Sequence, residues 1–280
     1  MRSMNLLCAS LMIAMLPLSM AGSETKPSAP TLTAAEIVDK NVAARGGLTA
    51  WRSVHTLEMK GTMEAGGNQR STLPVPGATK GMMKGVNVVP PRPKEQAQLP
   101  FVMDLQRGRK MRVELEFKGQ TAVQVYDGSN GWKVRPFLNR HEVEPFTQEE
   151  LQAASTQSDL DGLLIDYAAK GSKVELERVD QINGRNAYNL KVTDKSGYAR
   201  HVWVDAETFL EAKIEGTPRR LDGKYHPVSV YLHDYRSVSG LMMPYLLETA
   251  VEGVRDTEKI TIESIISNPK LDQARFSKPN

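Results

Sequence analysis

Apolar and polar residues alternate along most of the chain after residue 53. The clearest runs are Leu57 to Met63, Phe101 to Leu105 and Met111 to Phe117, in which every second residue is apolar. A period of two is typical of strands with one apolar face and one solvent-exposed face, and such strands normally belong to antiparallel sheets. The pattern therefore predicts a mainly β (α+β) protein with an antiparallel sheet of about 11–12 strands.

Three stretches have helical rather than alternating spacing. Thr33 and Glu36 have the spacing of a capping box, which predicts a helix over about Ala34 to Arg45 that Gly46-Gly47 would end. A second helix is expected from Thr147 to about Thr156. A third, short and apolar on one face, is expected over Asp159 to Tyr167.

The chain begins with the features of an export signal. Arg2 precedes an uncharged apolar run from Leu6 to Met20, and small residues flank a cleavage point after Ala21. We therefore expect a signal peptide over 1–21, a flexible leader over 22–32 and one domain over 33–280. Residues 66–98, rich in Pro and Gly, interrupt the strand pattern and are expected to form a long insertion loop.

The composition argues against several classes of function. The formal net charge is +3, and Arg2 is the only charged residue in the predicted signal, so the exported chain would carry +2. Such a balance argues against a nucleic-acid-binding protein. The single cysteine, Cys8, lies in the predicted signal, which leaves no disulfide, thiolate metal site or cysteine nucleophile.

The sequence contains few candidates for catalysis. The five histidines form no close metal-binding pair, and no nucleophile motif or phosphate-binding glycine loop occurs. Asp159 and Asp161 have a faint calcium-loop spacing but lack the later ligands, so we interpret them as a helix cap. Arg45 has two interpretations, a latch between a lid and the barrel or a cation at a helix C-terminus. Its ordinary placement favours the second.

Several motifs together resemble a known family. They are Ala35-Glu36-Ile37-Val38, Ala44-Arg45-Gly46-Gly47, the hairpin Tyr126-Asp127-Gly128-Ser129-Asn130-Gly131-Trp132, Val204-Asp205-Ala206-Glu207, Leu241-Met242-Met243-Pro244 and the closing Leu271 to Phe276. Their order is similar to that of periplasmic outer-membrane lipoprotein-sorting (LolA-like) proteins. The resemblance implies an open, curved antiparallel half-barrel with helices over its concave face, an apolar cavity between them, and a periplasmic location.

An apolar concave face could bind acyl chains, because each CH₂ group removed from water contributes roughly 0.8 kcal/mol. The candidate cavity residues are Met59, Met63, Phe101, Met103, Met111, Val113, Leu115 and Phe117. The candidate lid residues are Leu160, Leu163, Leu164 and Tyr167. For any one of these, packing in an ordinary core is the simpler explanation. The functional hypothesis concerns the whole set.

The sequence thus favours a periplasmic carrier that binds lipid or lipoprotein acyl chains, with no cofactor, no metal and no catalytic residue. Its partners would be the acylated cargo and a membrane-embedded donor or acceptor protein, and we expect a monomer. One alternative is a regulatory module of the same fold that senses lipoprotein or a membrane partner. A second is a hydrolase using Asp or His within the concavity.

Overall fold

The computed structural model describes residues 32–66, 96–136, 139–221 and 223–279. Within it, Thr33–Asn280 forms one compact unit. The predicted signal peptide, all but Leu32 of the predicted leader, and residues 67–95 of the predicted insertion loop lie outside the described residues. None of the described helices is long and apolar enough to cross a membrane.

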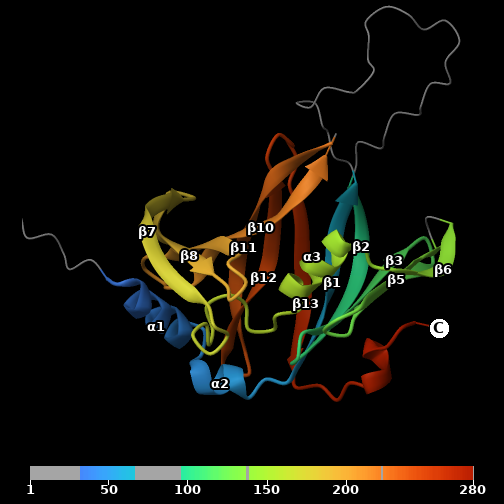
Figure 1. Ribbon diagram of the computed structural model, residues 1–280, viewed down its shortest axis with the longest axis horizontal. Coiled ribbons are helices and arrows are strands. Elements are labelled where there is room, and N and C mark those ends of the chain that lie inside the picture. Colours follow the sequence, from blue (N-terminus) through green and yellow to red (C-terminus); the bar gives the residue numbers. More distant parts are fainter. Residues whose placement is uncertain (1–31, 67–95, 137–138, 222, 280) are drawn as a thin grey trace, which may run out of the picture. The chain divides into compact units, whose positions relative to one another are not determined.

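The described residues form thirteen strands in a single antiparallel sheet, which is open (Figure 1). The strands are β1 (Thr56–Gly66), β2 (Gln96–Gln106), β3 (Lys110–Phe117), β4 (Gln120–Tyr126), β5 (Gly131–Arg135), β6 (Arg140–Pro145), β7 (Lys173–Ile182), β8 (Arg185–Thr193), β9 (Ala199–Asp205), β10 (Glu211–Leu221), β11 (Lys224–Val238), β12 (Leu241–Val251) and β13 (Glu258–Ser267). The predicted open sheet is confirmed. The expected number of about 11–12 strands is lower than the thirteen described, because β6 is short and rich in charged residues, which hides its alternation.

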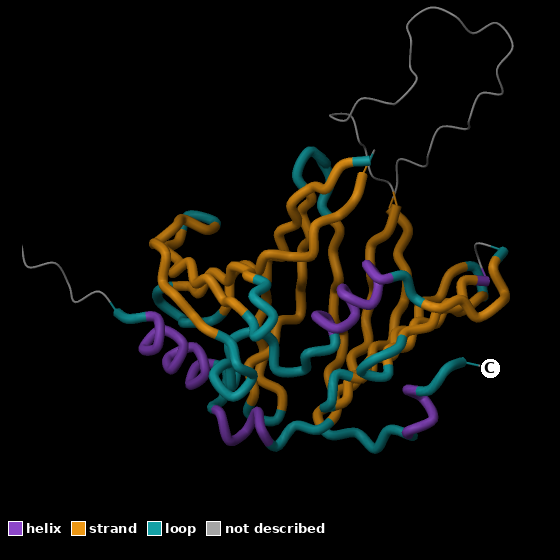
Figure 2. The backbone as a smooth tube through the Cα atoms, viewed as in Figure 1, coloured by secondary structure: helices purple, strands orange, loops and turns teal. Residues whose placement is uncertain are grey.

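The order of the strands joins two meanders. The sheet runs β6-β5-β4-β3-β2-β1-β13-β12-β11-β10-β9-β8-β7, so the first and last strands pair in its middle. Consecutive strands β6 and β7 consequently lie at opposite edges. The connection between them, residues 146–172, has to cross the sheet, and we call it the crossing segment. Figure 2 shows this helix-and-turn path between the two edges.

The helices begin and end as their local chemistry dictates. They are α1 (Ala34–Ala44), α2 (Leu48–Arg52), α3 (Gln148–Gln157) and the 3₁₀ turn η2 (Gln273–Phe276). Thr33 and Glu36 form the predicted capping box of α1, and Thr147 and Glu150 form another at α3. Gly46 and Gly47, at φ +108° and +89°, end α1 in conformations that suit glycine.

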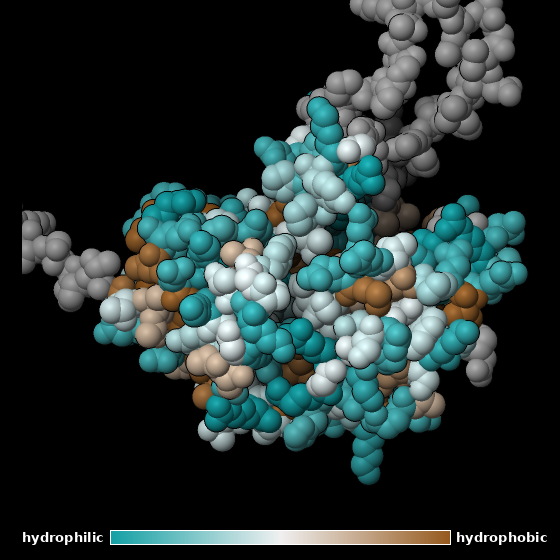
Figure 3. Space-filling model, in the orientation of Figure 1, coloured by the Kyte–Doolittle hydropathy of each residue, from teal (hydrophilic) through white to brown (hydrophobic). Residues whose placement is uncertain are grey.

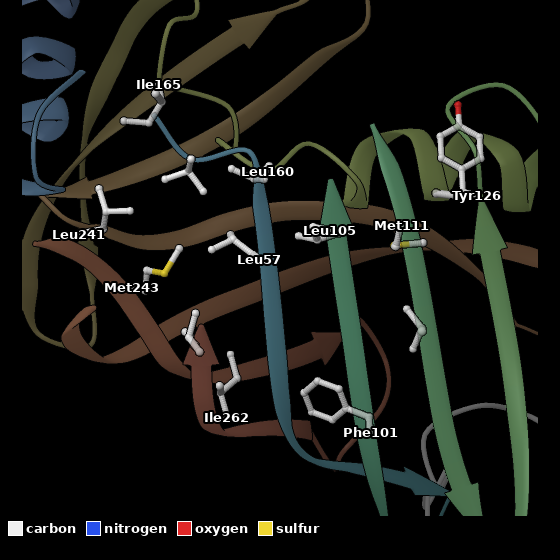
Figure 4. Packing of buried hydrophobic residues seen from close by; sticks show 14 of the residues in the cluster. Leu57, Phe101, Leu105, Met111, Tyr126, Leu160, Ile165, Leu241, Met243 and Ile262 are labelled. Atoms are coloured by element: carbon white, nitrogen blue, oxygen red, sulfur yellow. The ribbon is translucent and has the colours of Figure 1, made fainter. Parts of the chain in front are cut away.

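The core lies on one face of the sheet, which we call the concave face. Its buried residues include Leu57, Leu105 and Met111 from the strands, and Leu160 and Ile165 from the crossing segment. Figure 4 shows these side chains gathered in one space. The crossing segment therefore packs on the concave face and supplies part of the core.

The opposite, convex face is partly covered by the C-terminal residues. Arg275, in η2, forms an ion pair of 2.6 Å with Asp104 on β2, and Phe276 is buried beside it. Burial raises the pKa of Asp104, and the bond to Arg275 only partly offsets this effect. The chain end is thus fastened to the outside of the sheet rather than to the concave face.

The seam between β1 and β13 depends on Gly61. A Cβ at this position would lie 2.0 Å from the Thr261 carbonyl oxygen and 2.9 Å from the Ile262 Cα, at a point where the register shifts. We predict that Gly61→Ala destabilises the protein by about 1–3 kcal/mol because the backbone of β13 must move. Urea unfolding measures this loss. The control is Thr62→Ala on the convex face, and equal midpoints for the two variants would contradict the prediction.

Candidate functional site

The concave face carries its apolar side chains in rows that run across the strands. Residues that face each other in paired strands project to the same side of a sheet. One row joins Leu57, Leu105, Met111 and Tyr126 on β1 to β4. All four are buried, so the core closes over this row.

The next row differs because it is less covered. Met59 faces Met103, which in turn faces Val113. Val113 is buried, whereas Met59 and Met103 are half-buried and pack against the edge of the core. The concave face thus combines a sealed row with a neighbouring row that retains accessible apolar surface.

The other predicted cavity residues extend this arrangement. Phe101 is buried, while Leu115 and Met63 are half-buried against the core. Phe117 is half-buried at the end of β3, where the Lys118 ammonium lies 5.2 Å from the centre of its ring. The sequence therefore grouped seven residues that the structure brings to one core region, with Phe117 at its margin. Their role in binding stays a prediction.

The predicted lid residues lie in the crossing segment, but the expected helix over Asp159–Tyr167 is wrong. Turns occupy this stretch, because Gly162 and Asp166 adopt left-handed conformations with φ of +74° and +56°. Asp159 and Asp161 consequently cap no helix. The apolar side chains still face inward: Leu160 and Leu164 are buried, and Leu163 and Tyr167 are half-buried.

Ion pairs fasten the crossing segment, and sequence reasoning missed them. Arg107, in the turn between β2 and β3, makes two hydrogen bonds to the Asp161 carboxylate, at 2.8 and 2.9 Å. Arg52 at the end of α2 holds Asp166 in the same two-bonded way. The Lys170 ammonium donates to both oxygens of Asp159 at 3.0 Å. Each partner is distant in sequence or lies in a turn, so no local pattern reveals the pairs.

Arg45 adds a buried connection to the same segment. Its guanidinium pairs with Glu211 of β10 at 2.9 Å and donates to the Asp161 carbonyl oxygen at 3.3 Å. It also lies 4.3 Å from the centre of the Trp51 ring. The interpretation of Arg45 as only a helix-terminal cation is therefore wrong, since the residue joins α1, the sheet and the crossing segment.

Glu211 has a second partner in this buried network. Tyr235 on β11 donates from its hydroxyl to the Glu211 carboxylate at 3.2 Å. Burial and the neighbouring Glu211 charge raise the pKa of Tyr235 well above its ordinary value, so the phenol stays protonated and remains a donor. Tyr235 thus keeps its hydrogen bond to Glu211 at neutral pH.

Titratable residues elsewhere form surface clusters. His201 on β9 lies between Glu215 at 2.6 Å and Glu177 at 3.3 Å. Its neighbours Val202 and Val204 are fully buried on the concave side, which places His201 on the convex face. Among the described residues no group of three His, Asp or Glu side chains is placed to hold a metal ion. His201 therefore lends no support to a hydrolase site inside the concavity.

The surface in Figure 3 is largely hydrophilic. Apolar side chains appear there as separate patches among hydrophilic ones. The large apolar side chains that are most exposed are Val179, Tyr198, Tyr225 and Ile266. They come from different elements, so the apolar rows of the concave face are the coherent feature among the described residues.

The architecture matches solved structures. A LolA superfamily protein from Nitrosomonas europaea superposes with a TM-score of 0.52 and 13% identity, covering 89% of this chain and 99% of that one. The fold is LolA-like. A DUF1329 family protein from Desulfovibrio piger gives a TM-score of 0.53 at 13% identity, covering 88% and 98%. A domain assigned to outer-membrane lipoprotein sorting in Vibrio parahaemolyticus gives 0.52 at 12% identity, covering 87% and 95%.

The sequence by itself matches no known family profile and no characterised protein. At 12–13% identity the structural likeness establishes the LolA-like fold alone. The resemblance found in the short sequence motifs is therefore confirmed at the level of the fold.

The bond between Arg107 and Asp161 should govern the mobility of the crossing segment. We predict that Asp161→Asn, which removes the charge from a buried carboxylate, increases hydrogen–deuterium exchange in peptides covering residues 158–172. Peptides of the central strands should exchange as before. Glu207→Gln, at a largely exposed ion pair with Arg185, is the matched control. Unchanged exchange over residues 158–172 would show that the pair does not restrain the segment.

The pair between Arg52 and Asp166 should make part of the stability depend on pH. The hydrogen bond from Arg52 holds the pKa of Asp166 below its usual value. A carboxyl lowered in this way stabilises the fold above its unfolded pKa, about 3.9, and loses that contribution as pH falls through the folded value. We expect Arg52→Gln to lower the Tm at neutral pH and the difference to shrink below about pH 4. A difference that stays constant throughout acid titration would contradict this assignment.

Proposed function

We propose that this protein is a periplasmic carrier of lipid or lipoprotein acyl chains, which bind on the concave face beneath the crossing segment. The observation that carries the proposal is the half-buried row of Met59 and Met103 beside a sealed apolar core. Acyl chains gain about 0.8 kcal/mol for each CH₂ removed from water, so such a surface needs no polar chemistry to bind them. Methionine suits this role because its flexible side chain adapts to ligands of varied shape.

The crossing segment would act as the cover of the site. It reaches both edges of the sheet and supplies Leu160 and Ile165 to the same core. An acyl chain could replace these contacts on the sheet while the segment moves outward. The hydrogen bonds from Arg45, Arg52 and Arg107 to the crossing segment set the free-energy cost of this movement. Release of the ligand would restore these bonds.

The proposal includes delivery between membrane proteins. The cargo would come from a membrane-embedded donor and pass to an acceptor, with the carrier acting as a monomer and without a cofactor. The first experiment is mass spectrometry of lipids that co-purify with the protein, followed by displacement of a fluorescent fatty acid. The absence of both co-purifying lipid and saturable displacement would count against a carrier.

A pair of neighbouring substitutions tests where the chain binds. Met103 lies on the concave face, and Val102 beside it projects to the convex face. We expect Met103→Gln to weaken binding of the fluorescent fatty acid about tenfold, because a polar group replaces apolar contact worth about 1–2 kcal/mol. Val102→Gln should leave the affinity within about twofold. Equal effects of the two substitutions would place the ligand elsewhere.

A further inference from the structure

The half-buried row ends in polar side chains. The row runs from Met59 through Met103 to Val113, and Val113 faces Gln124 on β4. Gln124 in turn faces Lys133 on β5. The same face of the sheet thus changes from thioether and alkyl groups to an amide and then an ammonium group within five strands.

Lys133 is an unusual residue for this position. It is only 6% exposed, and its ammonium contacts both carboxylate oxygens of Glu150 at 2.5 Å. Lysine is almost never this buried unless paired, because removing the charge from water is costly. Plain attachment of α3 to the sheet could be achieved with apolar residues at a lower cost. The attachment of α3 to the sheet therefore does not by itself explain why a charged residue is buried at this position.

Arg135 places a second cation close by. It lies two residues after Lys133 on the same strand and so projects to the same face. One of its terminal nitrogens donates to Glu144 at 2.7 Å, while its buried Nε has no hydrogen-bond partner among the described residues. The polar end of the row thus retains donor capacity that the protein's own carboxylates do not fill.

Glu150 is the group that would have to yield to a ligand. Besides contacting Lys133, it accepts a hydrogen bond from the Thr147 amide at 2.8 Å in the capping box of α3. Burial opposes its ionisation, but the bonds from Lys133 and Thr147 prevail and lower the pKa of Glu150. Its side chain is 36% exposed. Rotation toward water would break its bond to the Thr147 amide, while the Thr147 hydroxyl would still accept from the Glu150 amide and cap α3.

We propose that Lys133, assisted by Arg135, binds the anionic head of an acyl ligand, a carboxylate or a phosphate, whose chain lies along the row toward Met59. This inference rests on the proposed function and narrows its ligand class. Five strands from β5 to β1 span about 19 Å at roughly 4.8 Å each. That distance is comparable to the roughly 15 Å of hydrocarbon in one leaflet of a bilayer. The row from Lys133 to Met59 therefore matches the length of a single long acyl chain.

The anionic head would take the place of the Glu150 carboxylate at Lys133. A ligand with a neutral head could still use the apolar row but would leave the pair of Lys133 and Glu150 intact. The site consequently distinguishes anionic lipids from neutral acyl esters. Charge-assisted bonds are about twice as strong as neutral ones, so the preference should be measurable.

The experiment compares three probes with the same chain of sixteen carbons: palmitate, hexadecyl phosphate and methyl palmitate. Each displaces a fluorescent fatty acid from the purified protein. We expect at least one anionic probe to bind about tenfold more tightly than the ester. The stronger of the two anions identifies the head as carboxylate or phosphate.

Lys133→Met should remove this preference and leave the affinity for methyl palmitate unchanged. Lys259→Met makes the same charge change on an exposed residue of β13 and should retain the preference. Glu150→Gln keeps a side chain that can cap α3 but no longer competes as an anion. It should raise the affinity for the anionic probes several-fold without affecting the ester.

The outcomes separate the two proposals. If the ester and the anions bind equally to the wild type, or if Lys133→Met retains the preference, the head-group site is wrong while the carrier proposal stands. A folded Glu150→Gln variant with unchanged affinity for anions also overturns the head-group site, and it does so even if Lys133→Met fails to fold. If none of the probes binds, both proposals fail.

Discussion

The position of β6 and β7 at opposite edges of one sheet constrains the rest of the molecule. Because these strands follow each other in the chain, residues 146–172 must pass from one edge of the sheet to the other, and they do so over the apolar face. The crossing covers a core that the sheet cannot bury alone. It also creates a part of the core that belongs to a connection rather than to a strand. A ligand that binds to this face therefore has to contact or displace the crossing segment.

Charge holds this connection where helix formation does not. The segment after α3 consists of turns, so it gains little from regular backbone hydrogen bonds. Arg45, Arg52 and Arg107 reach it instead from α1, α2 and the turn between β2 and β3. Each of these side-chain interactions is local and can break while the sheet stays folded. This arrangement is compatible with a cover that moves over a framework that does not.

Much of the fold followed from sequence because the local signals agreed with the final structure. The alternation around Met59, Phe101 and Met111 predicted one-sided strands, and Thr33 and Gly46 marked the ends of α1. The prediction failed at Asp159–Tyr167, where apolar spacing suggested a helix although two residues adopt left-handed conformations. The partners of Arg45 and Lys133 were also missed, since pairs such as Arg45 and Glu211 depend on which strands become neighbours. Apolar periodicity is local, whereas polar recognition depends on topology.

The pairing of β1 with β13 has a consequence for how the protein is made. The central seam joins the first strand to the last, more than 190 positions apart along the chain. A polypeptide that emerges with its N-terminus first can assemble the meander from β1 to β6 early, but β1 keeps one open edge until almost the whole chain is available. Contacts of such long range slow folding. Until they form, the unpaired backbone N–H and C=O groups of β1 can pair with another chain. The newly made protein therefore carries an unpaired strand edge until its last strand is available.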